Sequence, residues 1–418
     1  MKIARTLLTG IFTSLILLTL TIALTCITQA QTVTQNAQAL NIGFNGSDTS
    51  GSDNQLPYSD QFYTVTRAFY ATLGRQMPGN RHCHAYVSWD VALEPAGSGS
   101  TTQEGSLVWL QTWLANSQGH CDEALISFKW YNGVTCVYYT GCALGVSQTP
   151  PHPVEVGNAV HAFLQASWPG WTGTFAFTPW NEPNNAAASG DGFTNGSTVG
   201  ARTAADYYLA MRFYCIPANG CSIGAGDFAS NGNLWQDSIQ NCSDDDAALC
   251  TNATYMDTFK HYLNNDATAY GLASGFRPEV FAYHGWSDVN DFLNGNSNCA
   301  AVTTKTCVTW LTYYAFATDT HPANSSWTGV KFWDTEVGVG QDHGVASPTN
   351  DEQAKAAAFM IDLTATVSSR FWRIYYTRIW ETDGEYWSMF CSTGSQRPSL
   401  TVWADRETSY TNTGSVCP

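Results

Sequence analysis

Residues 175–184 read Phe-Ala-Phe-Thr-Pro-Trp-Asn-Glu-Pro-Asn, and this stretch decides the fold. An apolar run with the length and composition of a buried β-strand leads directly into a polar turn that contains Glu182. The strand therefore brings a carboxylate and the amide of Asn181 to one edge of a sheet. An ordinary surface turn is the alternative interpretation, because Asn-Glu-Pro is a short pattern.

Seven further strand-like segments occur along the chain, and helical patterns separate several of them. Alternating strands and helices are typical of a parallel sheet with helical crossovers, and eight such units predict a single closed (β/α)8 TIM barrel of class α/β. An open doubly wound sheet is the alternative, but no Gly-x-Gly-x-x-Gly follows the first strand. The other expected strands are 40–45, 85–89, 124–130, 222–227, 280–284, 330–336 and 374–380, and the expected helices are 61–73, 107–115, 154–167, 204–214, 255–270, 311–318 and 353–368.

In a barrel of this kind the functional groups lie where the strands end, on the face formed by the βα loops. The predicted strand ends are polar or aromatic, although the strands before them are apolar. A purely structural protein has no need of that pattern. Besides Asn181 and Glu182, these end positions are Asn45, Trp89, Asp90, Trp130, Asp227, His284, Glu336 and Trp380.

A second stretch strengthens the interpretation of the first. Residues 330–338 read Val-Lys-Phe-Trp-Asp-Thr-Glu-Val-Gly, so Glu336 ends the seventh expected strand, 154 residues after Glu182 at the end of the fourth. This arrangement resembles the clan A glycoside hydrolases, barrels whose fourth strand ends in Asn-Glu and whose seventh ends in a second Glu. The resemblance implies that Glu182 is the general acid/base and Glu336 the nucleophile. It also implies that Asn181 holds the sugar hydroxyl next to the anomeric carbon.

Two carboxylates are what a retaining glycosidase needs. One attacks the anomeric carbon, and the other protonates the leaving oxygen and then activates water. Their carboxyl groups lie roughly 5–5.5 Å apart in retaining enzymes and about 6.5–9.5 Å apart in inverting ones.

The sixth expected strand departs from the clan pattern. Members often have His-x-Tyr there, with the tyrosine hydroxyl directed at the nucleophile, whereas this chain has His284-Gly285-Trp286. We expect His284 or Tyr283 to supply the orienting donor, although a core histidine is the alternative for His284.

Aromatic residues at strand ends are candidates for sugar binding, because the C–H face of a sugar packs on an aromatic plane. Trp380 closes the eighth strand, where clan members carry a tryptophan under the sugar. Trp89 and Trp130 are similar candidates, and packing is their alternative role. Asn45 is expected at the barrel mouth. Asp90 and Asp227 are expected to bind sugar hydroxyls or to brace loops.

Residues 1–30 have the features of a secretory signal peptide: a basic start, an apolar run from Leu7 to Ile22, and a small-x-small site ending at Ala30. An uncleaved membrane anchor is the alternative. Residues 31–418 then form the catalytic domain. Of the 18 basic and 34 acidic residues the signal peptide takes away two basic ones, which leaves a net charge of about −18. Such a charge argues against nucleic acid or an anionic membrane as a partner.

The cysteines indicate the same oxidising compartment. The chain has 13, and twelve remain without Cys26. Several form short-range pairs that close easily as disulfides and would staple long loops. No paired Cys-x-x-Cys occurs, and His82-Cys83-His84 fits a strand with Cys83 bridged better than a metal site. The expected pairs are Cys136/Cys142, Cys215/Cys221, Cys242/Cys250 and Cys299/Cys307, with Cys83/Cys121 and Cys391/Cys417 as longer links.

The sequence thus predicts a secreted, monomeric, retaining glycoside hydrolase that acts on a polysaccharide or oligosaccharide without a cofactor or metal. A catalytically silent carbohydrate-binding barrel is the alternative, but it would not need both glutamates. A serine esterase is disfavoured because Gly-x-Ser-x-Gly is absent, and His-Glu-x-x-His is absent as well.

Overall fold

The chain is described here from a computed structural model, for residues 41–45, 64, 81–130, 151–184, 199–229, 255–286, 289, 330–337 and 371–377. The predicted signal peptide lies outside these residues. Within them, no helix is both long and apolar enough to cross a membrane.

Strands form in all eight segments where the sequence predicts them. The fifth is divided in two by Gly224. The bounds are β1 Asn41–Asn45, β2 His82–Ser88, β3 Glu123–Lys129, β4 Thr174–Thr178, β5 Cys221–Ile223, β6 Ala225–Ala229, β7 Val280–His284, β8 Lys331–Val337 and β9 Phe371–Thr377.

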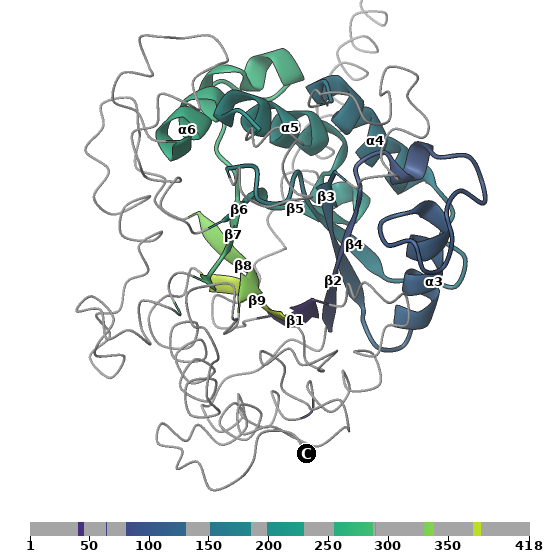
Figure 1. Ribbon diagram of the computed structural model, residues 1–418. Coiled ribbons are helices and arrows are strands. Elements are labelled where there is room, and N and C mark those ends of the chain that lie inside the picture. Colours follow the sequence, from purple (N-terminus) through teal and green to yellow (C-terminus); the bar gives the residue numbers. More distant parts are fainter. Residues whose placement is uncertain are drawn as a thin grey trace, which may run out of the picture.

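All neighbouring strands pair in parallel, in the order β5-β4-β3-β2-β1-β9-β8-β7-β6. The two ends of the sheet, β5 and β6, are therefore consecutive in the chain. Gly224 extends the pairing with β4, since its N–H donates to Phe177 O at 2.9 Å. A Cβ at position 224 would lie 2.9 Å from Trp333 Cε3, so only glycine fits there without a shift. The sheet thus curls round until its ends meet (Figure 1).

Four helices cover the outside of this sheet, each in a connection between successive strands (Figure 1). The N-termini of two are capped: Ser106 Oγ accepts from Trp109 N, and His152 and Glu155 form a capping box. The expected helices 61–73 (apart from residue 64), 311–318 and 353–368 lie outside the described residues, so the complete set of eight βα units stays a prediction. The helices are α3 Leu107–Ser117, α4 Pro153–Gln165, α5 Ala201–Tyr214 and α6 Tyr255–Asn265, with short 3-10 turns at Val91–Leu93, Pro217–Asn219 and Ala267–Tyr270.

Side chains alternate between the two faces of the sheet, as the period of two requires. On β3, Ala124, Ile126 and Phe128 belong to the main core cluster, which also holds the inner side chains of the helices. Leu125 belongs to a second, smaller cluster with Ala176, Ala282 and Trp333. The helices thus cover one face of the sheet and the second cluster fills the other.

At the carboxyl ends of the strands this inner face turns polar. The next inward-facing residue on each of these strands lies two positions further along. These residues are Ser127 after Leu125, Thr178 after Ala176 and His284 after Ala282, and all three are 0% exposed. Buried polar side chains need hydrogen-bond partners, so these residues have to satisfy one another.

One predicted disulfide forms and one does not. Cys215 and Cys221 are bonded, which closes the turn between α5 and β5. Cys83 and Cys121 are not bonded to each other, so that predicted link is wrong. Both are buried in the main core, where a small apolar thiol packs well. The other four expected pairs lie outside the described residues.

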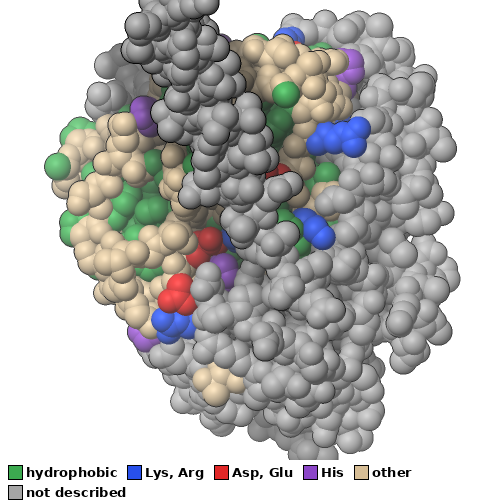
Figure 2. Space-filling model, turned by 180° about the vertical axis from the view of Figure 1, so that it is seen from behind, with side chains coloured by type: hydrophobic (Ala, Val, Ile, Leu, Met, Phe, Trp, Pro, Cys, Tyr) green, Lys and Arg blue, Asp and Glu red, His purple; other side chains and the backbone are tan. Residues whose placement is uncertain are grey.

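At the amino ends of the strands, Glu123 of β3 makes an ion pair with Arg373 of β9, and these side chains are 13% and 4% exposed. His82 Nδ1 lies 3.1 Å from Glu123 Oε1, and the Arg373 guanidinium stacks on Trp333 at 4.0 Å. Burial alone would raise the pKa of Glu123, but the charge of Arg373 and the bond from His82 lower it to about 2. On the described part of the surface seen in Figure 2, acidic, basic and histidine side chains lie next to one another rather than forming a patch of one sign.

We expect Glu123→Gln to lower the free energy of unfolding at pH 7 by about 3–5 kcal/mol, because it leaves Arg373 buried without its counter-charge. The pKa of Glu123 is depressed, so its contribution is present above the ordinary glutamate pKa and is lost as the pH falls towards 2. Denaturant unfolding between pH 2 and 7 should therefore show a shallower acid decline in the variant. Replacing both partners, in Glu123→Met/Arg373→Met, should recover part of the loss. Equal stability of wild type and Glu123→Gln at every pH would contradict this role.

Candidate active site

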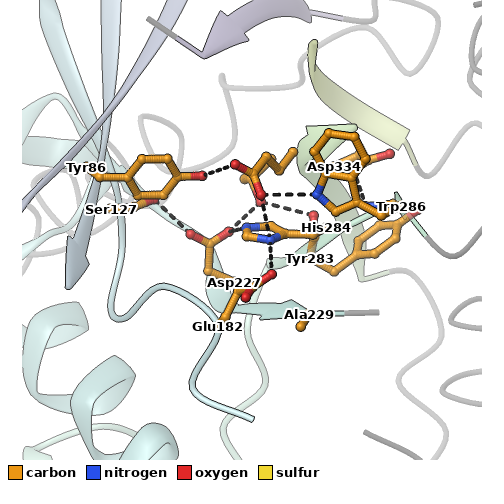
Figure 3. A network of polar contacts seen from close by, with 12 residues as sticks. Tyr86, Ser127, Glu182, Asp227, Ala229, Tyr283, His284, Trp286 and Asp334 are labelled. Atoms are coloured by element: carbon orange, nitrogen blue, oxygen red, sulfur yellow. Dashed lines mark hydrogen bonds and ion pairs between the residues drawn. The ribbon is translucent and has the colours of Figure 1, made fainter. Parts of the chain in front are cut away.

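The structure brings Glu182 and Glu336 together. Glu182 follows β4, Glu336 lies near the end of β8, and His284 at the end of β7 contacts both. Figure 3 shows His284 beside Glu182. Nδ1 of His284 is 2.8 Å from Glu182 Oε1 and 3.0 Å from Glu336 Oε2. This nitrogen and one oxygen of each carboxylate all lie within 4.8 Å of one another.

The backbone of Glu182 is held by its neighbours on both sides. Asn181 N donates to Phe128 O at 2.7 Å, and Glu182 N donates to Asp227 O at 2.8 Å. Glu182 has φ 44° and Asp227 φ 129°, and no other non-glycine residue among those described has a positive φ. Such conformations cost of order 1–3 kcal/mol each and cluster at functional sites.

Asn184 fixes the turn that follows. Its side-chain amide donates to Ala229 O and accepts from Ala229 N, both at 2.9 Å, so it pairs with β6 as another strand would. The last residue of the Asn-Glu-Pro-Asn stretch therefore anchors the turn that carries Glu182.

Three groups direct protons at the Glu336 carboxylate. Tyr86 OH donates to Oε1 at 3.0 Å, and Trp286 Nε1 donates to Oε2 at 3.1 Å, beside His284 Nδ1. Burial would raise the pKa of Glu336, but the charge of His284 and the bonds from His284 and Trp286 hold it well below its ordinary value. Glu336 is therefore an ionised carboxylate with fixed donors.

Tyr86 supplies the tyrosine hydroxyl that the sixth strand lacks, and the sequence interpretation missed it. The expected alternative, Tyr283, belongs instead to the main core cluster. The alternation of β2 could have identified Tyr86. The flanking Ala85 and Val87 belong to the main core cluster under the helices, so Tyr86 points to the opposite, inner face of the sheet.

His284 faces acidic oxygens from both ring nitrogens. Nδ1 faces the two glutamates, and Nε2 lies 3.4 Å from Asp227 Oδ1. The ionised carboxylates of Glu336 and Asp227 only accept, so the nitrogen that faces each of them carries a proton and the ring is an imidazolium. Burial would lower the pKa of His284, but the charges of Glu336 and Asp227 raise it well above the ordinary value.

The next residue, Gly285, helps to place this ring. Its N–H donates to Asp334 Oδ1 at 2.9 Å, and a Cβ at position 285 would lie 2.4 Å from Asp334 Oδ2. Glycine at position 285 thus lets β7 approach the Asp334 carboxylate closely enough for this bond.

The other predicted site residues are placed as follows. Trp89 and Trp130 are 1% and 4% exposed and belong to the main hydrophobic core, so neither presents an open ring face. Asn181 is buried, and its Oδ1 accepts no hydrogen bond from the described residues. Asn45 is the last residue of β1, and its side chain lies outside the description, as does the whole of Trp380.

No protein-family model and no curated protein sequence matches the chain. Solved structures resemble it at low sequence identity. An endo-β1,6-glucanase is 13% identical with a TM-score of 0.48, over 90% of this chain and 80% of that one. An endo-1,4-β-xylanase of Penicillium canescens is 10% identical with a TM-score of 0.48, over 89% and 95%.

The catalytic domain of a family 30 glycoside hydrolase, xylanase C of Talaromyces cellulolyticus, is 14% identical with a TM-score of 0.42, over 88% and 75%. At this level of similarity the comparison adds nothing about individual residues, and the assignment of roles rests on the geometry of this chain.

Glu182, His284 and Glu336 also offer three ligand atoms close enough to surround a metal ion. The histidine nitrogen nearest both glutamates is Nδ1, and the ionised Glu336 carboxylate accepts its proton. A nitrogen that carries a proton has no lone pair for a metal. We therefore interpret the three residues as a hydrogen-bonded cluster.

This interpretation predicts that the protein does not bind Zn²⁺ stoichiometrically at this cluster. Isothermal titration at pH 6–7, with wild type and with a Glu336→Gln variant, would measure it. Stoichiometric binding that the Glu336→Gln substitution abolishes would show a metal site instead.

Proposed function

We propose that this chain is a secreted retaining glycoside hydrolase that cleaves an extracellular polysaccharide or oligosaccharide. Its scaffold in this proposal is a complete (β/α)8 barrel, with Glu182 as general acid/base and Glu336 as nucleophile. One observation carries the proposal: carboxylate oxygens of Glu182 and Glu336 lie within 4.8 Å of each other. A pair whose nearest oxygens are this close supports the retaining arrangement, with carboxyl groups roughly 5–5.5 Å apart, over the inverting one of about 6.5–9.5 Å.

The environment of Glu336 fits a nucleophile. Its depressed pKa keeps the carboxylate ionised over the whole neutral range. Tyr86 and Trp286 bind one oxygen each and so fix the plane of the carboxylate. In the first step Glu336 attacks the anomeric carbon, the glycosidic bond breaks, and the leaving oxygen takes the proton of Glu182.

The second step reverses these roles. Glu182, now ionised, takes a proton from water, the water oxygen attacks the anomeric carbon, and the bond to Glu336 breaks. The product keeps the anomeric configuration of the substrate because each step inverts it once.

Asn181 and Trp380 complete the proposed site. Asn181 Oδ1 is a buried acceptor without a donor among the described residues, and such an atom is costly unless a ligand satisfies it. We assign it to the sugar hydroxyl beside the anomeric carbon. Trp380, which follows β9 by three residues, is proposed as the aromatic platform under the sugar.

The two glutamates have distinguishable roles in mutants. Glu336→Ala should abolish turnover with the fold intact. Glu182→Ala should slow substrates with poor leaving groups far more than activated aryl glycosides, because acid assistance contributes about 10²–10⁴-fold where the leaving group is poor. A panel of polysaccharides and aryl glycosides would identify the substrate, and proton NMR of the first-formed anomer would test retention. Full activity of either variant, or an inverted first product, would refute the assignment.

Tyr86→Phe should lower kcat/KM by about 10- to 100-fold, since a hydrogen bond to a charged group contributes about 1.5–3 kcal/mol. Removing a donor raises the pKa of Glu336. Activity needs this carboxylate ionised, so the acid limb of the pH profile should move to higher pH. A matched control is Tyr207→Phe, which deletes a buried hydroxyl that donates to Pro151 O on the helical layer. An unmoved acid limb in Tyr86→Phe would show that this hydroxyl does not orient the nucleophile.

A further inference from the structure

Asp227 lies at the centre of the polar network but takes no part in the proposed chemistry. It is 0% exposed, so of its two expected roles, binding sugar hydroxyls or bracing loops, burial disfavours the first. A β-bulge between Gly226 and Phe228 interrupts the pairing of β6 with β7, and Asp227 is the residue at that bulge.

Both oxygens of this carboxylate accept hydrogen bonds. Ser127 Oγ and Thr178 Oγ1 both donate to Oδ2 at 2.8 Å, and Thr335 Oγ1 donates to Oδ1. Burial would raise the pKa of Asp227, but the charge of His284 and its bonded partners lower it. Asp227 is thus an ionised, immobile anion held by β3, β4 and β8, and it faces the Nε2 edge of His284 (Figure 3).

Asp227 is linked to Glu182 by a backbone hydrogen bond, and to both glutamate side chains through His284. Its backbone oxygen accepts from Glu182 N at 2.8 Å. Its carboxylate faces His284, whose opposite edge binds Glu182 Oε1 and Glu336 Oε2. Its third donor, Thr335, is the chain neighbour of Glu336. One buried residue therefore connects to the backbone of the first glutamate and to the side chains of both.

We propose that Asp227 is a positioning residue, which acts through the His284 imidazolium to hold the carboxylates of Glu182 and Glu336 at the spacing needed for double displacement. This inference rests on the proposed function for its chemistry, but the arrangement of charges is independent of any substrate. Without Asp227, the ring would have no anion on its Nε2 edge among the described residues. It could then lose a proton or rotate away from the two glutamates.

Five charged or titratable groups around His284 come from four parts of the sheet. Glu182 follows β4, Asp227 lies on β6, Asp334 and Glu336 lie on β8, and His84 lies on β2. Burial lowers the pKa of His84 to about 4, so this ring is neutral and binds Ser127 Oγ at 2.7 Å. His284 is therefore the cation of this group, surrounded by carboxyl groups.

Nitrogen-15 NMR of histidine-labelled full-length protein tests the charge arrangement without a substrate, with His284→Asn used to assign the signal. In the wild type, His284 should carry protons on both nitrogens at pH 7.5. In Asp227→Asn its titration should move to lower pH by about 1–3 units, since an opposite charge at this range has been removed. Asp334→Asn is the matched control: it removes a buried carboxylate that binds a backbone N–H of the same segment, and it should give a smaller shift.

The kinetic test uses an aryl glycoside selected in the substrate panel. Asp227→Asn should lower kcat about 10²-fold with little change in KM, because it displaces reacting groups without touching the sugar. The basic limb of its pH profile should also move to lower pH. A merely structural role would lower Tm and leave the pH profile of the folded fraction unchanged.

The two proposals fail separately. A neutral wild-type His284 at pH 7.5 overturns the positioning role even if Asp227→Asn does not fold. An unchanged His284 titration or an unchanged kcat in a folded Asp227→Asn does the same, while retaining hydrolysis by the wild type would still support the proposed function. Failure of the wild type to give a retained product would overturn the function instead.

Discussion

The His284 imidazolium is the point on which the rest of the site depends. The carboxyl groups of Glu182, Asp227 and Glu336 converge on this ring, and the negative charges of Asp227 and Glu336 would repel each other at such short range and ionise poorly. A single buried cation that faces all three reduces this repulsion and at the same time sets their separations. The ring thus acts together with the backbone bonds of Glu182 and with the donors Tyr86 and Trp286 in placing the two glutamates.

That orientation is possible because the sheet alternates strictly. Inner positions in the middle of the strands are apolar and fill the interior, and the next inner positions are Ser127, Thr178 and His284. Several irregular positions gather at the site: Glu182 and Asp227 have positive φ, and the register of β6–β7 and β7–β8 shifts there, while β8–β9 also shifts at Phe332/Trp333. Regular pairing elsewhere supplies the rigidity that holds these unfavourable conformations in place.

The opposite end of the sheet is organised on a different principle. Glu123 and Arg373 neutralise each other there, with His82 beside the carboxylate and Trp333 stacked on the guanidinium. The site end, by contrast, holds a surplus of carboxylates. This contrast between the two ends of the sheet agrees with the rule that stability residues lie at the amino ends of barrel strands and chemistry at the carboxyl ends.

The sequence by itself determined the strand order, the parallel class and the two glutamates at strand ends, because periodicity and strand-end polarity are local properties of the chain. It also marked Asn181 and His284 as candidates. Tertiary structure alone decided that Tyr86 and Trp286 bind Glu336, that Asp227 is buried, and that Cys83 and Cys121 are not joined. Those facts depend on which side chains from distant strands meet at one level of the sheet. For Asp227, a bulge of one residue in β6 sets that level, and the sequence carries no periodic signal for a bulge.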